Sequence, residues 1–161
     1  MWKTLKARLP SLFAAVALPL AVGAASAWAA GPMDRYESFR RPPLSPPGAV
    51  FPVVWSALYL LMGVASWRVW KNRSCPQRRG ALALYGAQLA VNFVWPLLFF
   101  RWEKLGTAFF AVLLLWAMVF ALIHRFSFCD KAAAWMLLPY LLWLTFAAYL
   151  SLGTWFLNSQ Y

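Results

Sequence analysis

Apolar residues fill five long segments of the chain, and short polar stretches separate them. The segments lie at about residues 9–30, 50–67, 81–100, 105–123 and 132–157. Each is close to the roughly 20 residues that a helix needs to cross a bilayer. Because a backbone in lipid must satisfy its own hydrogen bonds, we predict an all-α integral membrane protein. It is expected to be one domain over residues 1–161, a bundle of five transmembrane helices.

The alternative membrane architecture, a β-barrel, does not fit this pattern. Strands of a barrel alternate apolar and polar residues, whereas the apolar runs here are continuous. Composition agrees with helices in lipid, since 63% of the residues are hydrophobic and only 12% are charged. Soluble domains carry about 25% charged residues. A water-soluble globule and a disordered chain are both excluded.

The first apolar segment allows a second interpretation, as a secretory signal peptide. Basic residues precede it, Leu12–Gly23 is an apolar core, and Ala25-Ser26-Ala27 matches a small-residue cleavage site. Cleavage would leave four helices. The segment is also long enough to span the membrane, and Trp28 would then be an interfacial anchor.

The net charge of +11 comes from basic residues in the predicted loops. Ten of them lie on the side of the N-terminus and five on the other side. Basic residues favour the cytoplasmic side of an inner membrane, so we predict a cytoplasmic N-terminus, a C-terminus outside and an outward-facing loop at 31–49, in a bacterial membrane. In an outer membrane this rule would not hold. No polar basic face exists outside the loops, which argues against nucleic acid as a partner.

Cysteine and the ionisable residues offer little chemistry. Cys75 and Cys129 lie in different loops on the side predicted to be cytoplasmic, where thiols stay reduced. One histidine and two separated cysteines make no zinc site, and we expect neither a metal nor a cofactor. No charged residue lies well inside a span, which argues against proton-coupled transporters, ion pumps and acid–base hydrolases.

Aromatic and uncharged polar residues do recur inside the spans at helical spacing. Three such rows are Trp55 with Tyr59; Gln88, Asn92, Trp95 and Phe99; and Pro139, Trp143, Ala147 and Ser151. Three helices therefore each offer an aromatic beside small or polar residues, the composition of an aromatic-walled ligand pocket. A packed core, with the amides bonding across helices, explains the same residues. Both interpretations stay open at this point.

The loop at 31–49 combines prolines with arginines. Pro42-Pro43 and Pro46-Pro47 make it stiff and extended. Arg35, Arg40 and Arg41 would meet either the carboxylates of a ligand or the phosphates of membrane lipid.

Three blocks of sequence resemble the TspO/translocator protein family, also known as tryptophan-rich sensory proteins and peripheral benzodiazepine receptors. They are Arg41-Pro42-Pro43-Leu44-Ser45-Pro46-Pro47-Gly48 running on to Val53-Val54-Trp55-Ser56-Ala57-Leu58-Tyr59; Gln88-Leu89-Ala90-Val91-Asn92-Phe93-Val94-Trp95-Pro96 with Phe99-Phe100; and Leu138-Pro139-Tyr140-Leu141-Leu142-Trp143-Leu144-Thr145-Phe146-Ala147. They follow one another at family-like spacing over about residues 35–156.

This resemblance implies a five-helix bundle, often a homodimer, with a pocket that the first loop closes. It implies porphyrin ligands, protoporphyrin above all, with sterols in some members and synthetic benzodiazepine and isoquinoline ligands. The implied ligand-binding residues are Tyr36, Pro46, Trp55, Tyr59, Asn92, Trp95, Trp143 and Ala147. A proposed light-dependent breakdown of porphyrin would make Trp55 and Trp143 the catalytic pair.

The chain departs from the family pattern in places. Leu44 stands where an aromatic is usual, and Leu152 and Phe156 stand where animal members have a sterol motif, which argues against sterol recognition through that motif. The leading hypothesis is a membrane receptor, carrier or sensor for porphyrin-like planar ligands. The alternatives are an enzyme that degrades porphyrin and a regulatory or scaffold protein acting through small-residue faces such as Ala83 and Ala87.

Overall fold

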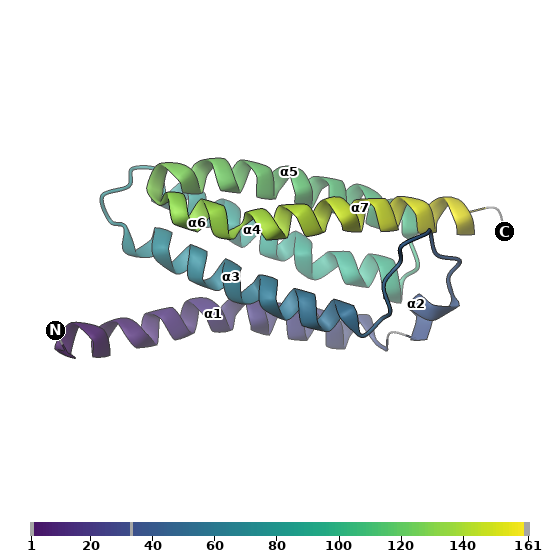
Figure 1. Cartoon of the computed structure of the whole chain (residues 1–161), viewed down its shortest axis with the longest axis horizontal. Helices are drawn as coiled ribbons and strands as arrows, with labels where there is room; N and C mark the ends of the chain where they lie inside the picture. The colour runs from purple at the N-terminus through teal and green to yellow at the C-terminus, as the bar shows by residue number, and fades with distance from the viewer. Residues whose placement is uncertain (1, 33, 160–161) are drawn as a thin grey trace.

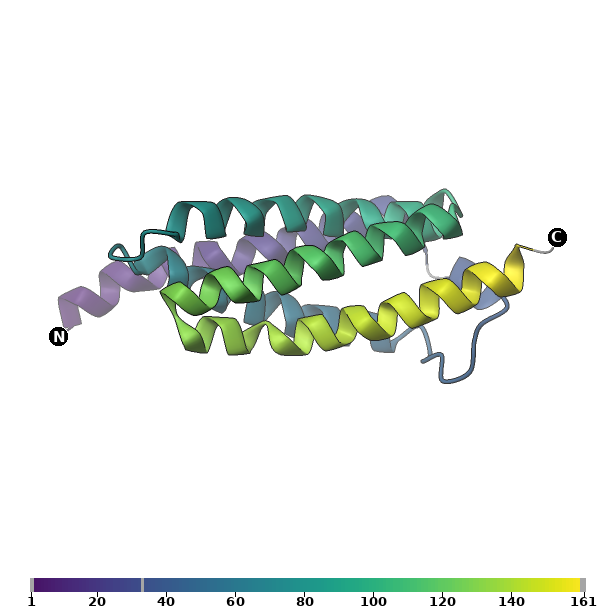
Figure 2. The same cartoon turned by 90° about the horizontal axis from the view of Figure 1, so that it is seen from above.

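Five long helices lie side by side in an antiparallel bundle in the computed structural model (Figures 1 and 2). The structure describes residues 2–32 and 34–159, without the side chains of residues 2–8, 34 and 35. The elements are α1 (Trp2–Ala30), α2 (Asp34–Ser38), α3 (Val50–Lys71), α4 (Arg78–Pro96), the π-helical turn η1 (Leu97–Arg101), α5 (Leu105–Cys129), α6 (Lys131–Met136) and α7 (Leu138–Asn158).

The predicted membrane fold is confirmed. Five helical stretches are long and apolar enough to cross a bilayer: Leu9–Ala30, Val50–Lys71, Arg78–Arg101, Leu105–Cys129 and Lys131–Asn158. Within the described residues there is no strand. The second and fourth stretches continue past their predicted ends at 67 and 123, because basic residues such as Arg68 and Arg125 extend the helices rather than ending them. The two termini lie at opposite ends of the bundle, as an odd number of spans requires (Figure 1).

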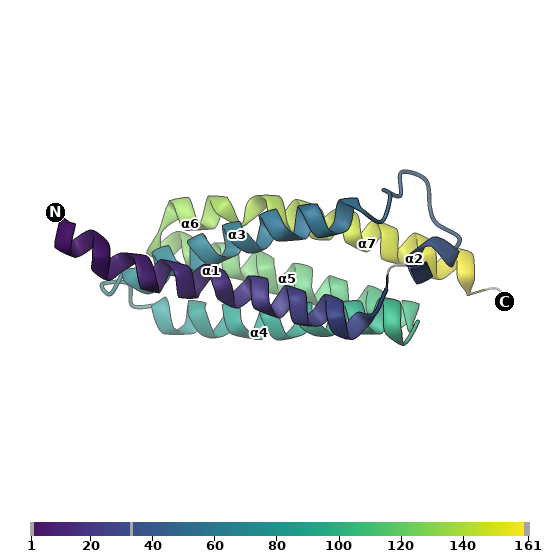
Figure 3. The ribbon, with the colours of Figure 1, turned by 90° about the horizontal axis from the view of Figure 1, so that it is seen from below.

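Helix α5 organises the core. Its buried residues recur every three or four positions, so they form one continuous stripe: Leu105, Ala108, Val112, Leu115, Val119, Leu122, Phe126 and Cys129. The stripe packs against α4, α6 and α7. Helix α1 packs against α3 and α4 on one side of the bundle (Figure 3). A cavity lies where α1, α3 and α4 meet.

Two prolines interrupt the helical hydrogen bonding. Pro96 has no N–H to donate, and directly after it the backbone loosens into η1, where Trp102 N–H donates to the carbonyl of Leu97 five residues earlier (2.9 Å). Pro139 lies in the first turn of α7, and the helix breaks before it at Leu137. The interruption predicted at Pro139 is therefore present.

The expectation that both cysteines stay reduced is wrong in this structure. Cys75 and Cys129 form a disulfide, with their Cα atoms 5.2 Å apart. Antiparallel packing brings the α3–α4 loop against the last turn of α5, and Asn72 Nδ2 donates to the carbonyl of Cys129 (2.6 Å). Arg68 also pairs with Asp130 at this end (2.9 Å). The sequence argument weighed the redox compartment and not this proximity.

At the opposite end, the first loop is fastened to α7. The amide of Asn158 bonds both backbone groups of Arg40: Nδ2 donates to its carbonyl (2.9 Å) and Oδ1 accepts from its N–H (3.1 Å). The hydroxyl of Tyr149 donates to the carbonyl of Pro43 (2.9 Å). Pro42 lies directly on Gly153, where any Cβ would come within 2.6 Å of the proline ring. Glycine at this position is what permits the contact.

Candidate ligand-binding site

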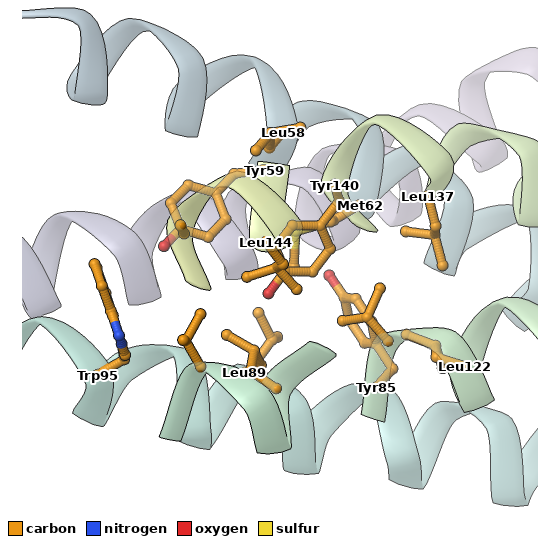
Figure 4. Close-up of a cluster of buried hydrophobic side chains, with 14 of the residues drawn as sticks. Leu58, Tyr59, Met62, Tyr85, Leu89, Trp95, Leu122, Leu137, Tyr140 and Leu144 are labelled. Carbon is orange, nitrogen blue, oxygen red and sulfur yellow. The ribbon is translucent and has the colours of Figure 1, made fainter. Parts of the chain in front are cut away.

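A buried chain of hydrogen bonds links three helices in the middle of the bundle. Tyr59 on α3 donates to Asn92 Oδ1 on α4 (2.7 Å), and Asn92 Nδ2 donates to the hydroxyl of Tyr140 on α7 (2.8 Å). Tyr140 in turn donates to Gln88 Oε1 (3.0 Å). Figure 4 shows Tyr59 and Tyr140 pointing inward among apolar neighbours. The predicted cross-helix bonding of Gln88 and Asn92 is confirmed, and the chain of bonds ties α3, α4 and α7 together.

Beside this chain lies a cavity of about 450 Å³, within the range of small-molecule pockets. Helices α1, α3 and α4, with Gly31 just after α1 and Phe100 of η1, supply its lining: Leu20, Gly23, Ala24, Ser26, Ala27, Ala30, Gly31, Phe51, Pro52, Trp55, Ser56, Tyr59, Asn92, Trp95, Pro96 and Phe100. None of these side chains is charged. The cavity therefore suits an uncharged, mainly apolar body.

The exposed part of the lining shows where the cavity opens. Ala24 and Ala27 on α1 and Pro52 and Ser56 on α3 are exposed, whereas the α4 residues Asn92 and Trp95 are buried. The opening therefore lies on the flank of the bundle, between adjoining faces of α1 and α3.

Four of the predicted site residues meet at this cavity, and four lie outside its lining. Trp55, Tyr59, Asn92 and Trp95 line it. The other four are placed behind it, on the loop and on α7: Tyr36, Pro46, Trp143 and Ala147. Both interpretations of the aromatic rows thus apply, because the rows on α3 and α4 line a pocket and the α7 row packs against core residues.

Phe51 is the wall that separates the two groups. It lines the cavity, and its ring makes edge contacts with Tyr36 (5.1 Å between ring centres) and Trp143 (6.0 Å) on its other side. Tyr36 is itself held by a hydrogen bond from its hydroxyl to the carbonyl of Pro46 (3.1 Å). Tyr36 of the first loop and Trp143 of α7 therefore both contact a residue that lines the cavity.

The tryptophan on α4 carries an unused donor. Trp95 stacks on Phe99 (5.4 Å) and meets Phe100 edge-on (6.0 Å), and it is only 6% exposed. Its Nε1 has no hydrogen-bond partner among the described residues, and neither has Nε1 of Trp143. A buried N–H without a partner is costly, and neither of these indole nitrogens has accessible surface.

Arg41 of the first loop and Arg101 after α4 both make contacts within the protein. The guanidinium of Arg41 lies 5.1 Å from the centre of the Tyr36 ring, beside a second, shallow hollow within the loop. Arg101, at the end of η1, donates to the carbonyl of Ala29 at the end of α1 (2.8 Å). The side chain of Arg35 lies outside the described residues.

The sequence interpretation missed the contribution of α1. Gly23 faces Tyr59 so closely that any Cβ would overlap the tyrosine ring. Ser26 is buried and donates to the carbonyl of Phe93 on α4 (2.7 Å). The signal was present as the run of small residues at 23–27, but the same run matches a signal-peptide cleavage site. Among the described residues no cluster of three metal-ligating side chains occurs.

Comparison with known proteins decides the family. The family model described as TspO/MBR matches residues 15–156, most of the chain. The chain belongs to the TspO/MBR family. It is 38% identical over 122 residues to a translocator protein of Ovis aries, covering 74% of this chain and 72% of that one. A tryptophan-rich sensory protein of Cereibacter sphaeroides is 37% identical over 127 residues, covering 79% and 78%.

Protein CrtK of Rhodobacter capsulatus matches over a longer range, with 34% identity over 150 residues, 92% of this chain and 93% of that one. The predicted resemblance is thereby confirmed. Membership of the TspO/MBR family, together with the five apolar helices, supports a multi-pass membrane protein with a receptor or sensor role.

Proposed function

We propose that this TspO/MBR family member is a membrane receptor that binds a porphyrin-type guest in the cavity between α1, α3 and α4. The observation that carries the proposal is the convergence of Trp55, Tyr59 and Trp95 from two helices on one uncharged cavity. Aromatic walls bind a flat conjugated ring through stacking and apolar burial. The sequence resemblance supplies porphyrin as the ligand class.

The charge distribution supports one orientation of such a guest. The cavity lining has no charged residue, so the macrocycle and not its carboxylates belongs inside. Arg41 and Arg101 lie at the end of the bundle where the first loop and η1 meet, near Phe51 and Phe100. Propionate groups directed to that end would remain hydrated and near guanidinium groups.

Tryptophan fluorescence tests the proposal. Protoporphyrin added to the full chain in detergent is expected to quench it saturably, and Trp55→Phe should lower the quenching because this indole lines the cavity. Trp135→Phe is the matched control, since Trp135 is 70% exposed on α6 at the other end. Absence of saturable quenching, or equal titrations for the parent and both variants, would refute the proposal.

A second candidate function is light-dependent breakdown of the bound porphyrin. The observation in its favour is the aromatic series Trp55, Phe51 and Trp143, in which Phe51 touches Trp143 and lines the cavity beside Trp55. Indoles this close to a photoexcited ring are oxidisable donors, with dioxygen as the final oxidant. Illumination in air should bleach porphyrin faster with the parent than with Trp55→Phe/Trp143→Phe. Equal bleaching rates reject this function.

A further inference from the structure

The end of the bundle that carries the disulfide is strongly basic. Helices α3 to α6 and the loops between them place seven basic residues there: Arg68, Lys71, Arg73, Arg78, Arg79, Arg125 and Lys131. Three of the four acidic residues of the chain lie at the opposite end, in α2 and between η1 and α5 (Figure 1). The fourth, Asp130, pairs with Arg68 and accepts from the N–H of Ala133 (3.0 Å). Among the residues that the structure describes, no carboxylate remains here for the other six basic side chains.

Arg125 extends from the last turns of α5 to the first turn of the neighbouring helix α4 (Figure 2). A Cβ at Gly80 would lie 2.8 Å from Nη1 of Arg125, so the missing side chain at Gly80 is what lets the guanidinium approach the backbone of α4. Arg125 is exposed, and it makes no hydrogen bond or ion pair with any described residue. The charge of Arg125 is therefore held against α4 and is open to a ligand.

Two more arginines belong to the same turn of α4. Arg79 directly precedes Gly80, is exposed and has no hydrogen-bond or ion-pair partner within the described ranges. Arg78 is half-buried and donates from Nη1 to the carbonyl of Trp70 in the last turn of α3 (2.9 Å), which leaves its other N–H groups for a second acceptor. Three guanidinium groups are thus attached to this turn or lie against it.

The first turn of α4 adds positive charge of its own. Gln77 at the N-cap makes no side-chain capping bond, and the first turn holds no acidic residue. The N-terminus of a helix carries a partial positive charge from its unpaired N–H groups. Three like charges beside such a helix end repel one another, so an anion that bridges them stabilises the arrangement.

The level of these residues along the helices indicates which anion is available. The apolar segments begin at residue 81 on α4 and end at residue 123 on α5, so Gly80 and Arg125 lie at the boundary of the hydrocarbon layer. Trp70 and Trp135 at the same end are 49% and 70% exposed, as expected for aromatic residues at headgroup level. Lipid phosphates lie at this level, and guanidinium groups bind phosphate through paired hydrogen bonds.

We infer that Arg78, Arg79 and Arg125 form a binding site for the phosphate of an anionic phospholipid at the junction of α4 and α5. A choline headgroup is disfavoured, because its ammonium group would bring a further positive charge to the three guanidinium groups. Phosphatidylglycerol has no such group. The cavity lies toward the other end of the bundle, so this site does not depend on the proposed porphyrin binding.

Native mass spectrometry of the full chain, released from detergent micelles, tests the site by counting bound lipids and measuring the Kd of each. The parent should bind one phosphatidylglycerol at least about fivefold more tightly than phosphatidylcholine. Arg125→Gln should weaken phosphatidylglycerol about fivefold, which corresponds to about 1 kcal/mol for one basic residue near an anionic headgroup. Equal affinities for the two lipids, or parent-like affinity in Arg125→Gln, overturn the inference.

Matched variants distinguish a defined site from general attraction by the net charge. Gly80→Ala keeps every charge but displaces the Arg125 guanidinium, so it should weaken phosphatidylglycerol several-fold, whereas a Cβ at Gly86 meets open space and Gly86→Ala should change nothing. Arg73→Gln removes an exposed charge from the α3–α4 loop and should also leave the Kd unchanged. Thermal unfolding verifies that each variant is folded. An equal loss in Arg73→Gln and Arg125→Gln, or no loss in Gly80→Ala, contradicts a site at this turn.

Glycerol 3-phosphate separates a lipid site from a site for soluble phosphates. It carries the phosphate without the acyl chains, so it should bind at least about tenfold more weakly than phosphatidylglycerol. Comparable affinity would assign the arginines to a soluble phosphate and overturn the lipid assignment. Protoporphyrin quenching in the same preparations keeps the two proposals apart, because Arg125→Gln should alter lipid binding and leave the quenching unchanged.

Discussion

Gly23 on α1 faces the ring of Tyr59 on α3 so closely that no side chain fits between them. The contact seats α1 against the cavity wall and holds Tyr59 over Asn92, to which it donates its hydrogen bond. A residue without a Cβ thus shapes the cavity wall although it has no chemistry of its own.

Gly23→Ala is expected to weaken guest binding at least tenfold, because the new methyl group displaces the Tyr59 ring into the cavity. Gly86→Ala is the matched control, since a Cβ at Gly86 on α4 meets open space. Saturable quenching by protoporphyrin measures the affinity of both variants. Unchanged affinity in Gly23→Ala would mean that the guest does not contact this part of the wall.

Asn158→Ala should release the first loop from α7. The substitution removes both hydrogen bonds to the backbone of Arg40, and the loop then opens more often. Trypsin cleavage at the Arg40–Arg41 bond should become several-fold faster. Ser159→Ala is the control, because its hydroxyl bonds only the carbonyl of Phe156 in its own helix. Equal cleavage rates in the two variants would show that Tyr149 and Pro42 suffice to hold the loop.

The disulfide predicts a membrane orientation opposite to the one that the distribution of basic residues predicts. A persistent bond between Cys75 and Cys129 requires an oxidising compartment at the end of the bundle that carries the N-terminus. The excess of basic residues assigns this same end to the cytoplasm. We expect a sulfonated maleimide to label both cysteines in intact cells after an impermeant reductant has been applied. Labelling only after permeabilisation would restore the charge-based orientation.

Stability should fall in acid through Asp130. Burial alone would raise the pKa of this carboxyl, but hydrogen bonds from the Ala133 N–H and the Arg68 guanidinium outweigh it and hold the pKa below its ordinary value. A lowered folded-state pKa stabilises the protein above the unfolded pKa of about 4, and this stabilisation is lost as the pH falls through the folded value.

Thermal unfolding between pH 7 and pH 2 measures this effect. Asp130→Asn should lower the stability at pH 7 by about 1 kcal/mol or less, because the ion pair is partly exposed. It should also flatten the decline in acid. If the stability of parent and variant fell by the same amount between pH 7 and pH 2, another carboxyl would be responsible for the loss of stability in acid.

The helices could be predicted from sequence because lipid imposes a strong and local constraint, about twenty apolar residues per crossing. Spacing could place Trp55 with Tyr59 on one helix face and Asn92 with Trp95 on another, since helical periodicity determines which residues share a face. The family resemblance, and not spacing, implied that the two faces meet at one pocket. Contacts between helices depend on how the helices pack, which no single segment encodes. For that reason the disulfide between Cys75 and Cys129 was not predicted.

The part of α1 in the cavity was missed for a different reason. Small residues at 23–27 serve three purposes equally well in a sequence: a cleavage site, a close helix contact and a pocket wall. Only the packing of α1 on α3 and α4 distinguishes them. Trp143 shows the converse case, because its spacing placed it on a face with Ala147 but could not reveal that Phe51 stands between it and the cavity.

The covalent bond between Cys75 and Cys129 lies at the opposite end of the bundle from the cavity. Fluctuations that separate the helices are smallest beside such a cross-link and grow with distance from it. Around Gly23, Phe51 and Trp95, separation of the helices is opposed by side-chain packing, the loop fastening and hydrogen bonds such as those from Ser26 to Phe93 and from Tyr59 to Asn92, but by no covalent bond. Reduction of the bond would spread this motion over the whole length of the helices and make a bound guest the principal restraint on the fold.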